Sequence, residues 1–104
     1  MIGPLRERIT LLEPARTPDG AGGASVDWTP SRRVWAASED RTSGLARLAG
    51  RYARTVRRRY TLRADAPIGP ETRIGQDGRV FRIVSVQRRQ GRKPYLLLGA
   101  EEVR

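Results

Sequence analysis

The chain has 104 residues, a length that fits one domain able to bury roughly 65% of the surface that its unfolded chain exposes. Its formal net charge is +10, which favours a polyanion such as nucleic acid as a neighbour, although the abundance of arginine also fits a biased genome. The sequence has no cysteine and no histidine, so disulfides, thiol nucleophiles, zinc clusters and histidine-dependent triads are excluded.

Targeting and membrane signals are not evident in the sequence. No apolar run approaches the length of about 18 residues that crosses a bilayer, and the start of the chain, "MIGPLRERIT", lacks the apolar centre of a signal peptide. We therefore expect a soluble protein that is made in the cytoplasm.

The first predicted strand covers residues 7–13, where Ile9 and Leu11 alternate with Arg8 and Thr10. The next stretch, "RTPDGAGG" at residues 16–23, has the Pro-Asp-Gly chemistry of a turn. It matches neither a dinucleotide fingerprint nor a Walker loop, because the spacing of the glycines is wrong and a strand follows. Because it is longer than a tight hairpin connection, we interpret it as a loop that docks a partner, and a merely solvated loop is the alternative. The residues assigned to docking are Thr17, Asp19, Gly20, Gly22 and Gly23.

Two further strands are predicted at residues 25–29 and 33–39, with a break at Pro30. Each carries a tryptophan, Trp28 and Trp35, for which core packing is favoured over a platform that stacks bases.

Residues 42–54, "TSGLARLAGRYAR", provide the one plausible helix. Leu45, Leu48 and Tyr52 recur at helical spacing. Gly44 and Gly50 would each destabilise such a helix by about 1 kcal/mol relative to alanine.

The second half of the chain reads as strands joined by polar turns. A strand at residues 55–63 places Tyr60 and Leu62 on one face with Arg58. A hairpin through Asp77-Gly78 leads into a long strand at residues 79–87, and a last strand begins at residue 95. We expect a mainly β fold: a small SH3-like or sandwich-like barrel of about six strands, with one short helix or ordered loop and long connections. The predicted core comprises Val34, Trp35, Tyr60, Leu62, Phe81, Ile83, Val84, Leu96 and Leu98.

Taken in order, these segments resemble the head-tail joining family of long-tailed bacteriophages, also called stopper or head-closure proteins, which has relatives in gene transfer agents. The resemblance spans nearly the whole chain and lies in "LRERIT" (5–10), "TPDGAGG" (17–23) with Trp28, "VWA" (34–36), "YTLR" (60–63), "RIGQDGRVFRIVSV" (73–86) and the terminal "LLLGAEE".

This resemblance implies a structural protein of a virion or phage-like particle, present as one domain over residues 1–104 and assembled in the bacterial cytoplasm. Its subunits would form a ring, hexameric or dodecameric, below the portal and its adaptor protein. The ring would close the exit channel for packaged double-stranded DNA and present a surface to the tail terminator or tail tube protein. No cofactor, metal or chemistry is implied.

The cluster of positive charge in residues 47–59 contains no acid, and we predict that it faces DNA in the channel or an acidic neighbour. Its members are Arg47, Arg51, Arg54, Arg57, Arg58 and Arg59.

Two other functions remain open from the residues. One is a free-standing nucleic-acid-binding barrel of the OB or SH3-like type, which would use Arg57, Arg58, Arg59, Arg88, Arg89 and Arg92. The other is an enzyme, for which only carboxylates and arginines are available. Adjacent acids such as Glu39 and Asp40, or Glu101 and Glu102, point to opposite faces of a strand and would not converge as acid and base. We therefore expect a protein that is not an enzyme.

Overall fold

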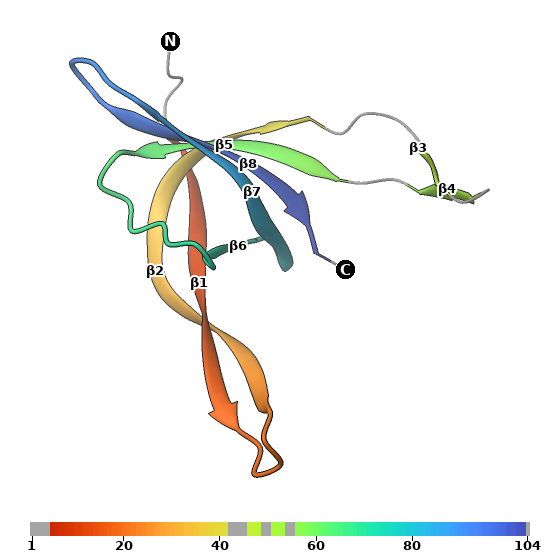
Figure 1. Cartoon of the computed structure of the whole chain (residues 1–104). Coiled ribbons are helices and arrows are strands. Elements are labelled where there is room, and N and C mark those ends of the chain that lie inside the picture. Colours follow the sequence, from red (N-terminus) through yellow and green to blue (C-terminus); the bar gives the residue numbers. More distant parts are fainter. Residues whose placement is uncertain (1–4, 42–45, 49–50, 54–55, 104) are drawn as a thin grey trace.

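The computed structural model describes residues 5–41, 46–48, 51–53 and 56–103. Six antiparallel strands form one sheet that closes into a small barrel, in the order β1-β2-β5-β8-β7-β6 (Figure 1). A separate pair of short strands, β3 and β4, lies in the chain between β2 and β5. The mainly β fold expected from the sequence is confirmed. The strands are β1 (Glu7–Pro18), β2 (Ala24–Asp40), β3 (Ala46–Leu48), β4 (Arg51–Ala53), β5 (Arg57–Arg63), β6 (Arg73–Gln76), β7 (Arg79–Arg89) and β8 (Tyr95–Glu102).

The core fills the inside of the barrel because alternate residues of each strand point inward. Phe81 lies at its centre and packs edge-to-face against Tyr60, with a distance of 5.9 Å between ring centroids. The buried apolar residues are Ile9, Leu11, Ala36, Tyr60, Leu62, Ile74, Phe81, Leu96, Leu98 and Ala100. Five of the predicted core residues are in this set, and Val34 and Ile83 pack at its edge.

Two core predictions are wrong, and the geometry of the strands explains both. Trp35 is 49% exposed because it neighbours the buried Ala36 on β2 and so points outward, where the Arg8 guanidinium covers its ring at 4.6 Å. Val84 is 50% exposed because it sits at a β-bulge, where the register of β7 against β8 shifts between Ile83 and Ser85.

A second bulge corrects the prediction that Pro30 separates two strands. β2 runs through Pro30 without interruption, while the register against β1 shifts between Leu11 and Leu12 so that Ser31 has no partner in the ladder. Proline lacks an N–H donor and is tolerated in sheets at such bulges. The Ser31 hydroxyl donates to the Leu11 carbonyl at 3.2 Å, and β2 therefore continues as one long strand.

The helix predicted for residues 42–54 is also wrong wherever the structure describes that segment. Residues 46–48 and 51–53 form the antiparallel pair β3–β4, with Arg47 opposite Tyr52. The two strands are separated in sequence by only Ala49 and Gly50, and a two-residue connection that contains glycine is a hairpin signal. That signal outweighs the helical spacing of the apolar residues.

Two long hairpins project from the barrel in different directions (Figure 1). The hairpin of β1 and β2 ends in the turn at residues 19–23, and the hairpin of β7 and β8 ends in residues 90–94. A third, tight hairpin joins β6 to β7 through Asp77 and Gly78, whose φ values of 52° and 76° fit the predicted Asp-Gly turn. The projections account for the molecule's dimensions of 51 × 37 × 23 Å.

Candidate functional site

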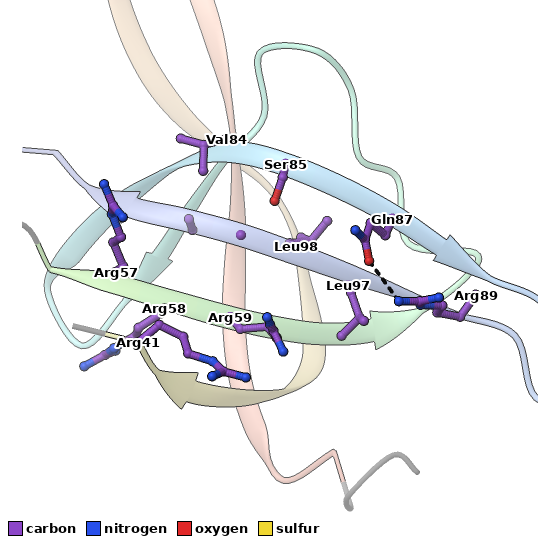
Figure 2. A pocket seen from close by; sticks show the side chains of 12 residues that line it. Arg41, Arg57, Arg58, Arg59, Val84, Ser85, Gln87, Arg89, Leu97 and Leu98 are labelled. Atoms are coloured by element: carbon purple, nitrogen blue, oxygen red, sulfur yellow. Dashed lines mark hydrogen bonds between the residues drawn. The ribbon is translucent and has the colours of Figure 1, made fainter. Parts of the chain in front are cut away.

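A shallow basic groove crosses the outer face of β5, β8 and β7 (Figure 2). In one row across these strands, Arg59 pairs with Gly99 and Gly99 pairs with Ser85. Because Gly99 has no side chain, the row is lowest at its middle, and the depression has a volume of about 220 Å³. We call this feature the outer groove. Its lining residues are Arg41, Arg57, Arg58, Arg59, Val84, Ser85, Gln87, Arg89, Leu97, Leu98, Gly99 and Ala100.

Some of the positive charge around the outer groove is compensated. Glu101 contacts both Arg57, at 3.2 Å, and Arg82, at 3.0 Å, while Arg41 lies 3.5 Å from Glu39. These partners lie outside residues 47–59, so the prediction from that segment alone missed them.

The charges of Arg59 and Arg89 are not compensated in this way. In the described part of the chain, neither guanidinium lies within 4.0 Å of a carboxylate. The Arg89 side chain donates instead to the Gln87 amide oxygen at 3.1 Å, as Figure 2 shows. The uncharged partner leaves the positive charge of Arg89 available to an anion.

Arg58 plays a different part from its neighbours in β5, because its guanidinium lies at one end of the barrel. It donates to Asp40 at 2.9 Å and to the Gln76 amide oxygen at 2.7 Å, and it lies 5.1 Å from the centroid of the Phe81 ring. The Tyr60 hydroxyl donates to the same Gln76 oxygen at 2.7 Å. The contacts of Arg58 thus connect the polar end of the barrel to its core.

The same cluster changes two pKa values. Burial raises the pKa of the Tyr60 hydroxyl, and the hydrogen bond and charge of Arg58 oppose part of that rise. Burial of the Arg58 guanidinium acts to lower its pKa, but hydrogen bonds to Asp40 and Tyr60 and the nearby negative charge raise it above its usual value. Arg58 therefore stays protonated and Tyr60 neutral at physiological pH.

Four of the remaining predicted arginines lie in described segments. Arg47 lies in β3 and Arg51 in β4, whereas Arg54 lies outside the described residues. Arg88 is an exposed residue near the end of β7, and Arg92 is exposed in the β7–β8 connection. The structure thus places Arg57, Arg59 and Arg89 at one groove and does not bring the full predicted set together.

The predicted docking loop is shorter than the sequence indicated. Thr17 belongs to β1 and pairs with Ser25, so the connection consists only of residues 19–23, which is within the usual range for hairpins. The Asp19 side chain accepts hydrogen bonds from the backbone amides of Ala21, at 2.8 Å, and Gly23, at 3.1 Å. Gly20 and Gly22 have φ values of 82° and 85°, a conformation that favours glycine. The long loop predicted from the sequence is therefore wrong, while the docking role of these residues stays a prediction.

Side-chain contacts brace the β1–β2 hairpin against the first residue of β6 and the segment that precedes it. Arg73 lies over the Trp28 ring at 3.9 Å from the centroid, and Arg16 forms a two-pronged hydrogen bond with Glu71 at 2.7 and 3.1 Å. The hydrogen bonds from Arg16 lower the pKa of the Glu71 carboxyl. Trp28 is thus half-buried beneath an arginine, and it is neither a core residue nor an open stacking platform.

The acid pairs considered for catalysis do not meet in a common site. Glu39 faces Arg41 and Asp40 faces Arg58, while Glu101 and Glu102 contact Arg57 and Arg79. Within the described ranges, no group of three or more acidic side chains could hold a metal ion. The same residues contain no helix that is long and apolar enough to cross a membrane.

Comparison with known proteins identifies the family. A model of the phage head completion protein family matches residues 1–103. The chain belongs to this family. Its fold is similar to a chain from the virion of a native gene transfer agent particle, with a TM-score of 0.70, 33% identity and 98% coverage of both chains.

A second solved structure similar to this family member is a Shigella flexneri 2a protein determined in solution. The TM-score is 0.63 and the identity 25%, over 97% of this chain and 95% of the other. A search of curated protein sequences finds no match. Membership of the phage head completion family makes the chain a structural virion protein of the head-tail region, as its sequence pattern predicted.

Proposed function

We propose that this protein is a stopper subunit, which forms a homo-oligomeric ring below the portal-side adaptor, closes the exit channel for packaged double-stranded DNA and presents the surface to which the tail attaches. The observation that carries the proposal is the match of the head completion family over residues 1–103. The similar fold of a chain in the gene transfer agent virion, over 98% of both chains, supports it.

The shape of the subunit supports a connector. A small barrel whose strands are all paired is a rigid core, and its hairpins extend away from that core to where neighbouring proteins would lie (Figure 1). The turn of the β1–β2 hairpin, with Asp19 holding two backbone amides, is a compact tip suited to insertion against an adaptor or tail protein.

The channel side of the ring is assigned to the arginine-rich segment. Six arginines between residues 47 and 59 would be repeated around one axis in a ring, which multiplies the positive field acting on DNA. Arg57 and Arg58 contact Glu101 and Asp40 inside their own subunit, so the other four arginines carry the proposed contact.

Removal and replacement of the gene in a particle-producing host tests this function. Without the protein, we expect heads that lose DNA or lack tails, and the wild-type gene supplied in trans should restore tailed, filled particles. Normal tailed particles in its absence would refute the connector role.

The exposed basic groove favours one second candidate, a free-standing nucleic-acid-binding module. Such a module binds DNA alone, whereas a connector assembles with a portal-side partner ring. Sizing of the purified protein with and without that partner separates the two, since a stable complex with the partner ring is expected only of the connector.

A further inference from the structure

The outer groove has the features of a site for a sugar-phosphate backbone. Arg59 stands on β5 and Arg89 on β7, with the low floor of β8 between them. Two strand spacings separate β5 from β7, so the walls are about 10 Å apart. A groove of this width accepts one extended phosphodiester strand.

The donors along the groove match phosphate oxygens. Arginine presents a planar fork of N–H groups that binds phosphate in a two-pronged manner. The Ser85 hydroxyl and the Gln87 amide add neutral donors on the β7 side, and both residues are exposed. Phosphate would therefore meet donors along the whole β7 wall.

The charge balance favours a polyanion. Four arginines other than the inward-turned Arg58 line the groove, while its described surroundings include the carboxylates Glu39 and Glu101, which already contact Arg41 and Arg57. Glu39 is also the cross-strand partner of Arg59 in the β2–β5 ladder, but its carboxylate lies toward Arg41. The arginines on the two walls thus keep a surplus of positive charge.

The lining also indicates how the nucleic acid would be held. None of the lining residues is aromatic, so bases have no ring to stack on, and the floor is formed by Leu97 and Gly99. Contacts would be made to the backbone alone, without preference for sequence. Duplex DNA, with its high density of phosphates, is the occupant that fits best.

We propose that the outer groove binds the phosphate backbone of double-stranded DNA. Arg59 binds it from the β5 wall and Arg89 from the β7 wall, while Gly99 on β8 leaves the floor free of a side chain. The inference rests on the proposed function, because that function brings packaged DNA to the subunit. It differs from the channel assignment above in adding β7, β8 and Arg89 to the contact.

Titration of the purified chain against a fluorescein-labelled 20-base-pair duplex, followed by anisotropy at several salt concentrations, tests the proposal. We expect the Arg59→Gln/Arg89→Gln variant to bind at least about tenfold more weakly, with a salt slope shallower by about 1.8, because each phosphate contact contributes about 0.9. Arg32→Gln/Arg33→Gln is the matched control, since it removes the same charge from exposed positions on β2. An equal loss in both variants, or none in the groove variant, would overturn the proposal.

A second pair of variants tests the shape of the groove at constant charge. A methyl group at Gly99 collides with the Ser85 hydroxyl but lies 3.7 Å from Ser85 Cβ, an ordinary contact. Ser85→Ala/Gly99→Ala therefore fills the floor without a clash, and we expect it to bind the duplex several-fold more weakly than Ser85→Ala alone. Equal affinity of these two variants would show that the floor does not contact DNA.

Two controls separate this proposal from its alternatives. A polyglutamate competitor that displaces DNA as well as unlabelled duplex does, at equal charge concentration, would show that the groove takes protein carboxylates and would reject the DNA assignment. A chain that restores tailed particles in the gene-replacement experiment but binds no duplex rejects this inference alone. A chain that binds duplex but does not restore tails rejects the proposed function and leaves the groove as a DNA site.

Discussion

At the scale of single residues, a chain of polar contacts closes one end of the barrel above an apolar core. Gln76 is nearly buried, at 6% exposed, and uses its amide oxygen for Tyr60 and Arg58 and its amide nitrogen for Glu7 at 2.9 Å. Glu7 in turn accepts from the backbone amide of Ser38 at 2.8 Å. In the described residues every buried side-chain nitrogen and oxygen has a hydrogen-bond partner, which is the condition under which a buried network stabilises a fold.

Phe81 is the residue on which core stability should depend most. Its side chain is fully buried and contacts both the Tyr60 ring and the Arg58 guanidinium. We expect Phe81→Ala to lower the free energy of unfolding by about 3 to 5 kcal/mol, because it leaves a cavity in a small barrel. A urea melt measures this, and Val86→Ala on the exposed part of β7 should cost far less. A change near zero for Phe81→Ala would contradict the packing.

Tyr60 should make stability depend on pH in the alkaline range. Because its folded-state pKa is raised, the folded protein holds the phenolic proton more tightly than the unfolded chain does. Its stabilising contribution is complete below about pH 10, the unfolded value, and is lost as pH rises through the folded pKa. Tyr60→Phe should flatten this loss in urea melts above pH 10, and an unchanged pH dependence in that variant would contradict the role of Tyr60.

At the scale of elements, the outer part of the β1–β2 hairpin should contribute little to the stability of the barrel. Beyond Leu12, its β1 strand pairs in the sheet only with β2, and the hairpin is held by side-chain contacts with Glu71, Thr72 and Arg73. The tip therefore adds little to the core and is available for contacts outside the subunit.

Shortening the hairpin tests its docking role. Deletion of residues 21–24 removes most of the turn and one pair of the ladder, and we expect the melting temperature to fall by less than about 4 °C, because the loss lies on the surface. Particle assembly should nevertheless fail. Replacement of Asp19 by Ala, which loosens the tip without shortening it, should give an intermediate defect. Normal assembly of the deletion variant would refute docking.

The strands also show which structural features a sequence pattern can predict and which it cannot. Strict alternation predicted the inward face of β5 and the barrel class, and the Asp-Gly signal placed the β6–β7 turn. Patterns in a single strand could not reveal the bulges at Ser31 and Val84, which depend on the partner strand's register. The outer groove was predicted only in part. The alternative of a nucleic-acid-binding barrel already grouped Arg57, Arg59 and Arg89, but the floor at Gly99 and the acid partners depend on how strands that are distant in sequence pair.

At the scale of the whole molecule, the positive charge of Arg47, Arg51 and Arg54 should have its largest effect in the assembled particle, where the proposed ring repeats it. Replacement of Arg47, Arg51 and Arg54 by glutamine should leave the fold intact but yield about tenfold fewer DNA-filled, tailed particles, because a ring repeats each lost charge. Arg6, Arg32 and Arg33 replaced by glutamine form the control with equal net charge. Particle counts by electron microscopy measure the effect, and full assembly by the first variant would remove those arginines from the channel.

The closure of the barrel by the β1–β6 pairing also affects subunits that have not yet assembled. Each barrel strand in the described structure has a hydrogen-bonded neighbour on both sides, so the barrel body offers no free edge on which another chain could add a strand. Open edges remain where the long hairpin runs beyond the barrel. Uncontrolled polymerisation by strand addition is thereby limited, so that concentrated subunits can remain dispersed before they assemble.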